Sequence, residues 1–424
     1  MREGSLTNHR KRQLLFRGAA CAIGPHESTH ASIQITGERI TRILASGMPD
    51  GDVSHCTNID LSGYLILPGL VNAHDHLEFS LFPRLAHPPY RSYIDWGEDI
   101  HTRFSEIIAR HRAVPKDIRL WWGGIRNLLC GVTTVSHHNP LWQQLQSDTF
   151  PVRVVRKYGW AHSLALGGDI RHARGMTPEG APFILHACEG VDEQAQEELR
   201  ELERLGLLDS NTVLVHGLAI DHKGAALLRD RNASLIVCPS SNNFLFQQIP
   251  DLATLGGIER IALGSDSPLT AEGDLLDEIR FARRYCGIPS TTAYEMVTTT
   301  PAAILRLEDA EGSIRESGIG DLTAIRDTGQ EPAERVEGLS MNDVELVVIG
   351  GQVRLAAEMI YERLPLIEKH GMEAISVDGS IRWLRAPVKM LLQKTEEALG
   401  AGCVQLGRRT IKLPARAEMI EHAR

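Results

Sequence analysis

Residues 68–76 have the sequence PGLVNAHDH, an apolar run that ends in His74 and His76. Side chains two positions apart on a β-strand point to the same side, so both imidazoles face one way if this run is a strand. Two histidines at this spacing offer two metal ligands together, although a solvated strand end has the same pattern. The stretch therefore predicts one wall of a metal site.

Apolar runs of β type alternate with longer amphipathic stretches between about residues 64 and 304, which is typical of βαβ units in a parallel sheet. The seven runs are 64–73, 131–137, 152–160, 182–187, 212–218, 234–239 and 260–265. Helical spacing of Leu and Ile is clearest at 192–206 and 273–286. We expect an α/β fold with a TIM-type (β/α) barrel, either complete or with one shortened βα unit.

Short β runs also flank this region, separated by Gly and Asn/Asp signals. They lie at 13–23, 31–37 and 39–47 before it, and at 320–327 and 344–355 after it. Neither flank makes a good sheet alone, so we expect both to join into a small β-sandwich subdomain. The predicted boundaries are 1–63 and 311–363 for the two parts of this subdomain, 64–310 for the metal-dependent barrel, and 364–424 for a C-terminal extension of unknown role. Within the extension we expect a helix at 386–400 and a final strand at 404–414.

Later predicted strands also end in polar side chains, namely His186, His216 and Asp266. Parallel barrels carry functional residues at the C-terminal ends of their strands, so these groups should converge on one mouth together with the first histidine pair. Three neutral imidazoles and a carboxylate suit zinc, or iron, better than magnesium or calcium. We expect one divalent ion, which lowers the pKa of a bound water from about 15.7 toward 7.

Glu189 lies three residues after His186 and can overhang the same mouth without being a ligand. There it would move a proton from water to a leaving nitrogen as a general acid/base. The alternative is a place in the first turn of a following helix, where the helix dipole favours a carboxylate. His216 would orient the water or the substrate, or bind a second metal. A two-metal hydrolase of phosphatase or lactonase type would also need a modified Lys157.

The Pro-rich stretch 77–100 combines aromatic and charged residues and is suited to cover the barrel mouth, since ligand pockets are mostly apolar with a few placed polar groups. Packing of this loop on the barrel rim is the alternative. One of His137 and His138 should point at the site and the other away. Ser and Asn after a strand are equally common as turn formers. The candidates for substrate contacts are Arg84, Trp96, His138, Ser241 and Asn242.

The composition limits the class of partner. The net charge of -9 argues against a general nucleic-acid binder, whereas a small uncharged or cationic substrate is compatible. Seven cysteines without a CxxC pair favour a reducing compartment, so the cytoplasm is the expected location. We expect no signal peptide in the first 24 residues and no apolar run that spans a bilayer. The composition leaves open whether the chain forms a homo-oligomer.

The segments PGLVNAHDH, HACE, VHG, CPSSN and GSDSPLTAEGDLLDE together resemble the amidohydrolase superfamily, in its branch of cytosine, guanine and adenosine-type deaminases and triazine hydrolases. The resemblance covers about residues 13–355. It implies that Glu189 is the proton shuttle, that His216 orients substrate or water, and that Asp266 also shares protons with the nucleophilic water. The metal ligands that it implies are His74, His76, His186 and Asp266.

The resemblance implies a hydrolase that attacks a non-peptide C–N bond of a small, cyclic molecule, in the manner of a deaminase. The alternatives are ring opening of a cyclic amide or imidazolone, and an inactive barrel relative that serves as a binding protein. The chain departs from the family between His138 and His186, where the family fits two strands with their helices, and residues 157–168 match none of its motifs. A shortened unit there would change one wall of the pocket and leave the metal ligands in place.

Overall fold

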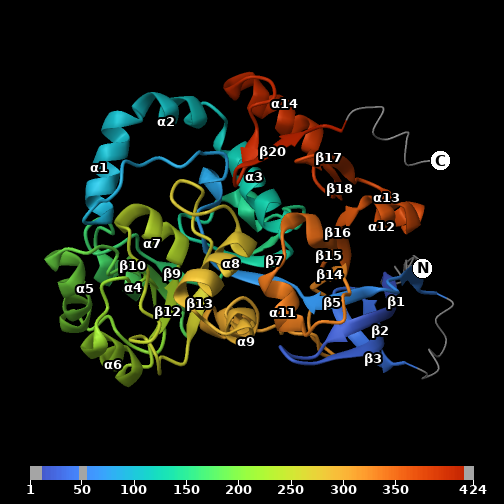
Figure 1. Cartoon of the computed structure of the whole chain (residues 1–424), viewed down its shortest axis with the longest axis horizontal. Helices are drawn as coiled ribbons and strands as arrows, with labels where there is room; N and C mark the ends of the chain where they lie inside the picture. Colours follow the sequence, from blue (N-terminus) through green and yellow to red (C-terminus); the bar gives the residue numbers. More distant parts are fainter. Residues whose placement is uncertain (1–11, 47–54, 415–424) are drawn as a thin grey trace, which may run out of the picture.

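The computed structural model describes residues 12–46 and 55–414. These residues form an α/β structure in which parallel strands with surrounding helices lie beside one large, mostly antiparallel sheet (Figure 1). The expectation that the chain has no signal peptide concerns mainly residues 1–11, which lie outside the described ranges.

One sheet contains strands from both ends of the chain. Its order is β19-β20-β17-β18-β16-β15-β14-β5-β1-β2-β3, and β4 pairs with β1. The strands before the parallel region are β1 (Gln13–Ala22), β2 (Ser28–Thr36), β3 (Arg39–Ala45), β4 (Thr57–Asp60) and β5 (Tyr64–Pro68). Those after it are β14 (Leu322–Arg326), β15 (Val344–Ile349), β16 (Gln352–Ala357), β17 (Glu373–Val377), β18 (Ser380–Leu384), β19 (Gln405–Leu406) and β20 (Arg409–Lys412). The two flanks do join in one sheet, through β5, which pairs with both β1 and β14 although the sequence assigned it to the barrel. The sandwich form of this subdomain stays a prediction.

The parallel strands form two ladders, β6-β7-β8 and β13-β12-β11-β10-β9. Their bounds are β6 (Leu70–Asp75), β7 (Val132–His137), β8 (Arg153–Val154), β9 (Gly159–Trp160), β10 (Phe183–Ala187), β11 (Thr212–His216), β12 (Ser234–Val237) and β13 (Ile261–Leu263). The structure therefore confirms a parallel α/β unit. Because no pair of described strands joins the two ladders, closure into one barrel stays a prediction, as do the domain boundaries.

Four predicted β runs are each divided into two strands. The run 344–355 covers β15 and most of β16, and the predicted final strand 404–414 is the antiparallel pair β19 and β20. The run 64–73 is divided at Gly69 into β5 of the large sheet and β6 of a parallel ladder. The backbone crosses between sheets there, and a Cβ on Gly69 would lie 2.3 Å from side-chain atoms of Thr133. The run 152–160 is also two short strands, since its first part pairs with β7 and its last part with β10.

Helices cover the parallel strands and cap one end of the large sheet (Figure 1). They are α1 (Tyr93–Arg103), α2 (Ser105–Arg112), α3 (Lys116–Leu129), α4 (Ile170–Gly175), α5 (Glu193–Arg204), α6 (His222–Asp230), α7 (Pro239–Phe246), α8 (Leu275–Cys286), α9 (Ser290–Glu295), α10 (Thr299–Ile304), α11 (Pro332–Glu337), α12 (Glu358–Arg363), α13 (Leu366–Lys369) and α14 (Val388–Leu399), with short 3-10 turns η1 (Leu77–Phe79), η2 (Gln143–Gln146) and η3 (Met341–Asp343). The predicted helices at 192–206, 273–286 and 386–400 are confirmed as α5, α8 and α14. Among the described residues, none of the helices has both the length and the apolar character needed to cross a bilayer.

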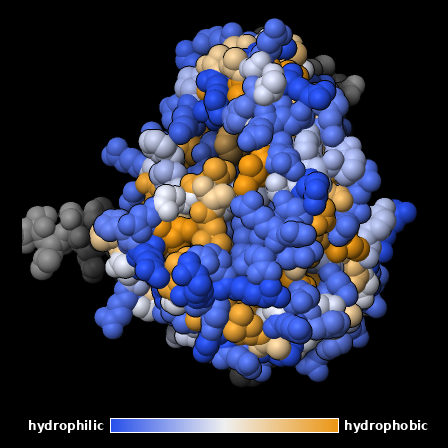
Figure 2. Space-filling model, turned by 90° about the vertical axis from the view of Figure 1, so that its left-hand side faces the viewer, coloured by the Kyte–Doolittle hydropathy of each residue, from blue (hydrophilic) through white to orange (hydrophobic). Residues whose placement is uncertain are grey.

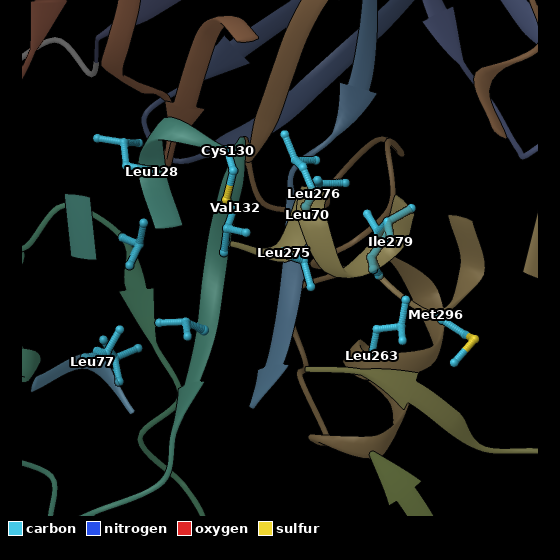
Figure 3. Close-up of a cluster of buried hydrophobic side chains, with 14 of the residues drawn as sticks. Leu70, Leu77, Leu128, Cys130, Val132, Leu263, Leu275, Leu276, Ile279 and Met296 are labelled. Atoms are coloured by element: carbon cyan, nitrogen blue, oxygen red, sulfur yellow. The ribbon is translucent and has the colours of Figure 1, made fainter. Parts of the chain in front are cut away.

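The surface around α1 and α5 is shown in Figure 2. It is largely hydrophilic, and hydrophobic side chains gather near its middle. The main core lies between the parallel strands and the helices that pack on them (Figure 3). There Leu70 of β6 and Val132 of β7 lie near Leu128 of α3, and Leu263 of β13 lies near Ile279 of α8. Burial of this apolar surface stabilises the arrangement that brings the strand ends together.

The C-terminal extension is tied to the parallel unit through α14. Trp122 of α3 is fully buried, and its Nε1 donates a hydrogen bond of 2.7 Å to Thr395 Oγ1 on α14. A buried N–H that loses its acceptor destabilises a protein by about 1–3 kcal/mol. The hydroxyl of Thr395 therefore couples the extension to the core.

Replacing Thr395 by valine should lower the free energy of unfolding by about 1–3 kcal/mol, because Trp122 Nε1 keeps its burial and loses its acceptor. Urea unfolding followed by Trp fluorescence measures this change. Gln393→Ala on the exposed side of the same helix is the control and should stay within about 0.5 kcal/mol of the wild type. Equal stabilities for Thr395→Val and Gln393→Ala would show that the contact does not couple the two parts.

Candidate metal centre

Three consecutive polar residues at the end of β6 have side chains that point alternately to its two sides. His74 and His76 face the centre, and their rings lie 4.9 Å apart between centroids. Asp75 faces away and accepts hydrogen bonds from Arg126 Nη2 at 2.6 Å and from Asn127 Nδ2 at 2.6 Å, both on α3. Because all of these side chains are buried, this network fixes the strand end that carries the two histidines.

His186 and Asp266 complete the set that the sequence predicted. His186 Nε2 lies 3.3 Å from His74 Nε2, while Asp266 Oδ1 lies 3.9 Å from His74 Nε2 and 3.8 Å from His76 Nε2. The other nitrogen of His186, Nδ1, lies 2.8 Å from the carbonyl oxygen of His162, which only an N–H at Nδ1 can satisfy. The lone pair of His186 Nε2 therefore points into the centre, in the tautomer that metal-binding histidines adopt.

Some of the separations between these four side chains are close to those of a zinc site. Donor atoms bound at about 2.1 Å to a tetrahedral zinc ion lie about 3.4 Å from one another. The separations from His74 to His186, from His74 to Asp266 and from His76 to Asp266 are 3.3 to 3.9 Å. The donor atoms nevertheless form two groups within 4.8 Å, namely His74 with His76 and Asp266, and His74 with His138 and His186, so His186 must move toward His76 and Asp266 for all four to bind one ion. Burial lowers the pKa of His74 and His186 well below the ordinary value, with further lowering by neighbouring imidazoles, so both rings are neutral donors.

Asp266 is held by hydrogen bonds as well as by its place after β13. Ser241 Oγ and Thr270 Oγ1 donate to Oδ2 at 2.8 and 3.1 Å, and the backbone N–H of Ser267 donates to Oδ1 at 2.7 Å. Burial alone would raise the pKa of this carboxyl, but nearby His76 and His216 and these hydrogen bonds outweigh it and lower the pKa. Asp266 is therefore an ionised ligand candidate.

Glu189 and His216 face each other across the same centre. Glu189 Oε2 lies 3.5 Å from His216 Nε2, and both residues are buried. Burial raises the pKa of Glu189 well above the ordinary value, and the charges of Asp266 and Glu198 add to the effect. Burial lowers the pKa of His216 to about 4, so this ring is neutral, and its Nδ1 lies 3.3 Å from Asn242 Nδ2. A protonated carboxyl beside a neutral imidazole can carry protons near pH 7.

The sequence left open which of two further histidines faces the centre, and it did not indicate a third. His138 points into the centre, with its ring 4.1 Å from that of His186, whereas His137 turns away, with Nε2 3.5 Å from Glu78 Oε2. His162, which no motif indicated, lines the cavity, and burial lowers its pKa to about 4. A histidine two residues after the apolar stretch 152–160 was the available signal for it.

A cavity of about 90 Å³ opens onto these groups. Its lining residues are His76, Phe79, Tyr93, Trp96, His162, His186, Glu189, His216, Asp266, Ser267, Leu269 and Thr270. Phe79, Tyr93 and Trp96 come from the Pro-rich stretch that the sequence suggested as a cover for the mouth. Tyr93 is fixed by a hydrogen bond of 2.8 Å from its hydroxyl to Ser163 Oγ, and Trp96 by one of 2.8 Å from Nε1 to the carbonyl of Leu85.

The predicted substrate contacts lie in different places, and His138 is not among the residues that line the cavity. Trp96 lines the cavity, while Ser241 and Asn242 lie behind it and hold Asp266 and His216. Arg84 does not line the cavity, and its role as a substrate contact stays a prediction. Its Nε donates to the carbonyl of Ala271 at 2.7 Å and its Nη2 pairs with Glu272 at 3.1 Å. These partners hold the guanidinium away from the mouth.

The lysine needed for a second metal is also elsewhere. The side chain of Lys157 is 62% exposed, and its Nζ lies 3.7 Å from the carboxylate of Glu308. It does not line the cavity that contains the histidines. This position argues against a two-metal site built on a modified lysine.

Three residues at strand ends have left-handed backbones. The φ angles are 56° at Cys188, 77° at His216 and 50° at Asp266. Such conformations are uncommon for residues other than glycine and persist where surrounding contacts impose them. At Cys188 the contact is a hydrogen bond of 2.6 Å from its backbone N–H to Glu198 Oε2 of α5. The turn sets the direction of the next residue, Glu189.

Comparison with known proteins shows the family of the chain. Residues 162–354 match the model of the Amidohydrolase family. A 5-methylthioadenosine/S-adenosylhomocysteine deaminase of Haloquadratum walsbyi is 30% identical over 354 residues, which are 69% of this chain and 78% of the relative.

Two solved structures share the fold. An atrazine chlorohydrolase from Arthrobacter aurescens, complexed with zinc, has a TM-score of 0.69 at 16% identity, with 91% of this chain and 99% of that chain covered. An adenosine deaminase from Xanthomonas campestris with bound zinc has a TM-score of 0.65 at 18% identity, with 91% and 98% covered. At these identities the likeness concerns the fold alone.

His74→Ala should reduce bound divalent metal from near one equivalent to well under half, because it removes the imidazole whose Nε2 lies 3.3 Å from that of His186. Metal analysis after dialysis against a weak chelator measures this. His87→Ala, an exposed histidine outside the cavity, is the matched control and should keep the wild-type content. Full metal content in His74→Ala would contradict the ligand assignment.

Glu198 should make stability depend on pH. Burial raises its pKa to about 7, opposed in part by the hydrogen bond from Cys188 and supported by the charge of Asp192. Between an unfolded pKa of about 4.3 and the folded value, the native state keeps a proton that the unfolded chain has lost, so stability falls as pH rises through this window.

Glu198→Gln keeps an acceptor for Cys188 and removes the titration. The loss of unfolding free energy between about pH 5 and pH 8 should then be smaller than in the wild type by about 2–3 kcal/mol. Urea unfolding at both pH values measures it. If the variant lost as much stability as the wild type over this range, another group would be responsible.

Proposed function

The chain belongs to the amidohydrolase family, and from this premise we propose that its metal centre removes ammonia from an amino-substituted nitrogen heterocycle. The protein is a metal-dependent hydrolase that acts on a non-peptide C–N bond of a small molecule. The deaminase names of its curated relatives support deamination over ring opening.

One observation carries the proposal, namely that Glu189 shares a cavity with the candidate ligands while bonding to none of them. Its carboxyl is 6% exposed and lies 3.5 Å from His216 Nε2. The raised pKa of Glu189 keeps it protonated in the resting centre, so a proton is available for a leaving nitrogen. An inactive binding protein would have no need of a buried, protonated carboxyl at this place.

We propose that His74, His76, His186 and Asp266 hold one zinc ion. When bound, zinc lowers the pKa of a coordinated water and so supplies a hydroxide nucleophile near neutral pH. Soft and neutral imidazole donors favour zinc, or iron, over magnesium, which prefers an all-oxygen shell. The surface position of Lys157 supports a single ion.

The side chains of the chain supply the proton transfers and the orientation of the substrate. Glu189 passes a proton to the departing amino group and takes one from the attacking water, so it ends each turnover unchanged. Neutral His216 donates or accepts a hydrogen bond at the ring of the substrate, and Asn242 holds its imidazole. The reaction replaces the amino group by a carbonyl oxygen and releases ammonia.

The cavity favours a compact substrate. Its volume of about 90 Å³ is well below the 300–1,000 Å³ that is usual for drug-sized ligands. Phe79 and Trp96 supply aromatic faces against which a flat ring can stack. A nucleoside would need the stretch that carries these residues to move outward, whereas a single heteroaromatic ring needs less movement.

Glu189→Gln should keep its metal and lose about 10²- to 10⁴-fold in kcat, because the amide cannot transfer protons. Purified enzyme loaded with zinc is assayed for ammonia with purines, their nucleosides, pyrimidines, triazines and cyclic amides. His162→Gln, which changes the cavity wall without removing a proposed ligand, is the comparison and should alter KM more than kcat.

Three outcomes would contradict the proposal. Near-normal turnover in Glu189→Gln would remove its role in proton transfer. Products formed by ring opening without ammonia would show a cyclic amide hydrolase, and full stability after chelation with no metal bound would favour a binding protein.

A further inference from the structure

A second pocket lies away from the metal centre, where β8 begins beside the turn between β15 and β16. Its volume is about 290 Å³. Its lining residues are Arg12, Glu38, Ser147, Asp148, Phe150, Val152, Arg153, Arg156, Ile349, Gly350, Gln352 and Arg354. None of these residues lines the cavity of the metal centre. Four arginines around one small pocket are unusual in a chain with a net charge of -9.

Arg354 on β16 is the least compensated of the four. It is 9% exposed, and none of the described carboxylates lies within ion-pair distance of it. Its Nη2 donates to the backbone carbonyl of Asp148, and its Nε has no hydrogen-bond partner among the described atoms. A buried guanidinium without a counter-charge is unfavourable, which indicates that an anion is missing from its surroundings.

The neighbouring charges make the position of Arg354 still less favourable. Burial lowers its pKa to about 10, Arg385 and Arg153 contribute in the same direction, and the charges of Asp148 and Asp321 offset only part of this effect. Burial likewise lowers the pKa of Arg12 to about 10, helped by Arg385 and Arg354. The repulsion between these guanidinium groups would be relieved by a negative charge placed among them.

The other arginines are paired but keep donors for a ligand. Arg153 Nη2 lies 3.3 Å from Asp321, and its Nε has no partner among the described atoms. Arg156 pairs at 3.6 Å with Asp148, whose side chain is 99% exposed and free to swing away. Each guanidinium has five N–H donors, so one carboxylate leaves several unused.

We propose that this pocket binds an anion that carries a phosphate group, with Arg354 as its central contact. The planar fork of a guanidinium donates two parallel hydrogen bonds to phosphate oxygens, and several forks around one pocket match a doubly charged tetrahedral group. The volume exceeds what a free phosphate needs, and Phe150 and Ile349 offer an apolar wall for a small organic part. Inorganic phosphate and a phosphate monoester share this chemistry.

The test is calorimetric titration of the full-length protein with inorganic phosphate and, separately, with glycerol phosphate. Chloride keeps the ionic strength equal in all samples, because screening alone changes surface electrostatics. The wild type should show saturable binding of at least one of the two. Tighter binding of glycerol phosphate identifies an ester as the ligand, and equal or tighter binding of inorganic phosphate identifies the free ion.

Arg354→Met should weaken this binding at least tenfold. The matched control is Arg382→Met, because Arg382 is similarly buried at 7% exposure, also donates to backbone carbonyls, and lies on β18 of the same sheet outside this pocket. The control should keep wild-type affinity. Arg156→Gln alters a half-exposed side chain at the pocket edge, so it should fold normally and weaken binding several-fold.

Thermal unfolding separates binding from a purely structural role. Phosphate should raise the Tm of the wild type and of Arg382→Met and leave that of Arg354→Met unchanged. The proposal is wrong if neither anion gives saturable heat with the wild type, if chloride at equal ionic strength raises the Tm as much, or if Arg354→Met and Arg156→Gln both bind as the wild type does.

Discussion

The contact between β6 and the end of β13 is the constraint on which the metal centre depends. Gly264 lies against His74, and a Cβ at this glycine would be 2.5 Å from His74 Cβ. Just beyond it, the backbone N–H of Asp266 donates to the carbonyl of His74 at 3.1 Å. The first and last parallel strands can approach this closely only because the side chain is absent, and the approach places a carboxylate beside His74 of β6 and His76, which follows it.

Burial also sets the protonation states of the side chains in the centre. The same transfer out of water that keeps His74 and His186 neutral keeps Glu189 protonated, because a low-dielectric surrounding disfavours the charged form of each group. Asp266 differs, because the hydrogen bonds that it accepts and the imidazoles around it lower its pKa in spite of burial. One physical cause therefore prepares both the neutral donors of a metal site and an acid for the leaving group.

Some features of the fold and the site could be predicted, and others could not. The placing of His186, His216 and Asp266 after apolar runs was sufficient to expect their convergence, since parallel strands end at one edge. The division of 64–73 at Gly69 was missed, because both halves are apolar and the crossing between sheets depends on contacts with Thr133 and Asp321. The ion pair of Arg84 was also not predicted, because its partner Glu272 lies far along the chain.

The sequence alone determined which residue types stand at the strand ends and which side of each strand they share, since these follow from the two-residue repeat of a strand and from local hydrophobic runs. Only the tertiary structure decided that His138 joins the cluster while His137 pairs with Glu78, and that Phe79, Tyr93 and Trp96 close the cavity. The reason is physical: a local pattern sets the direction of a side chain, but its contacts depend on segments that only the folded chain brings together.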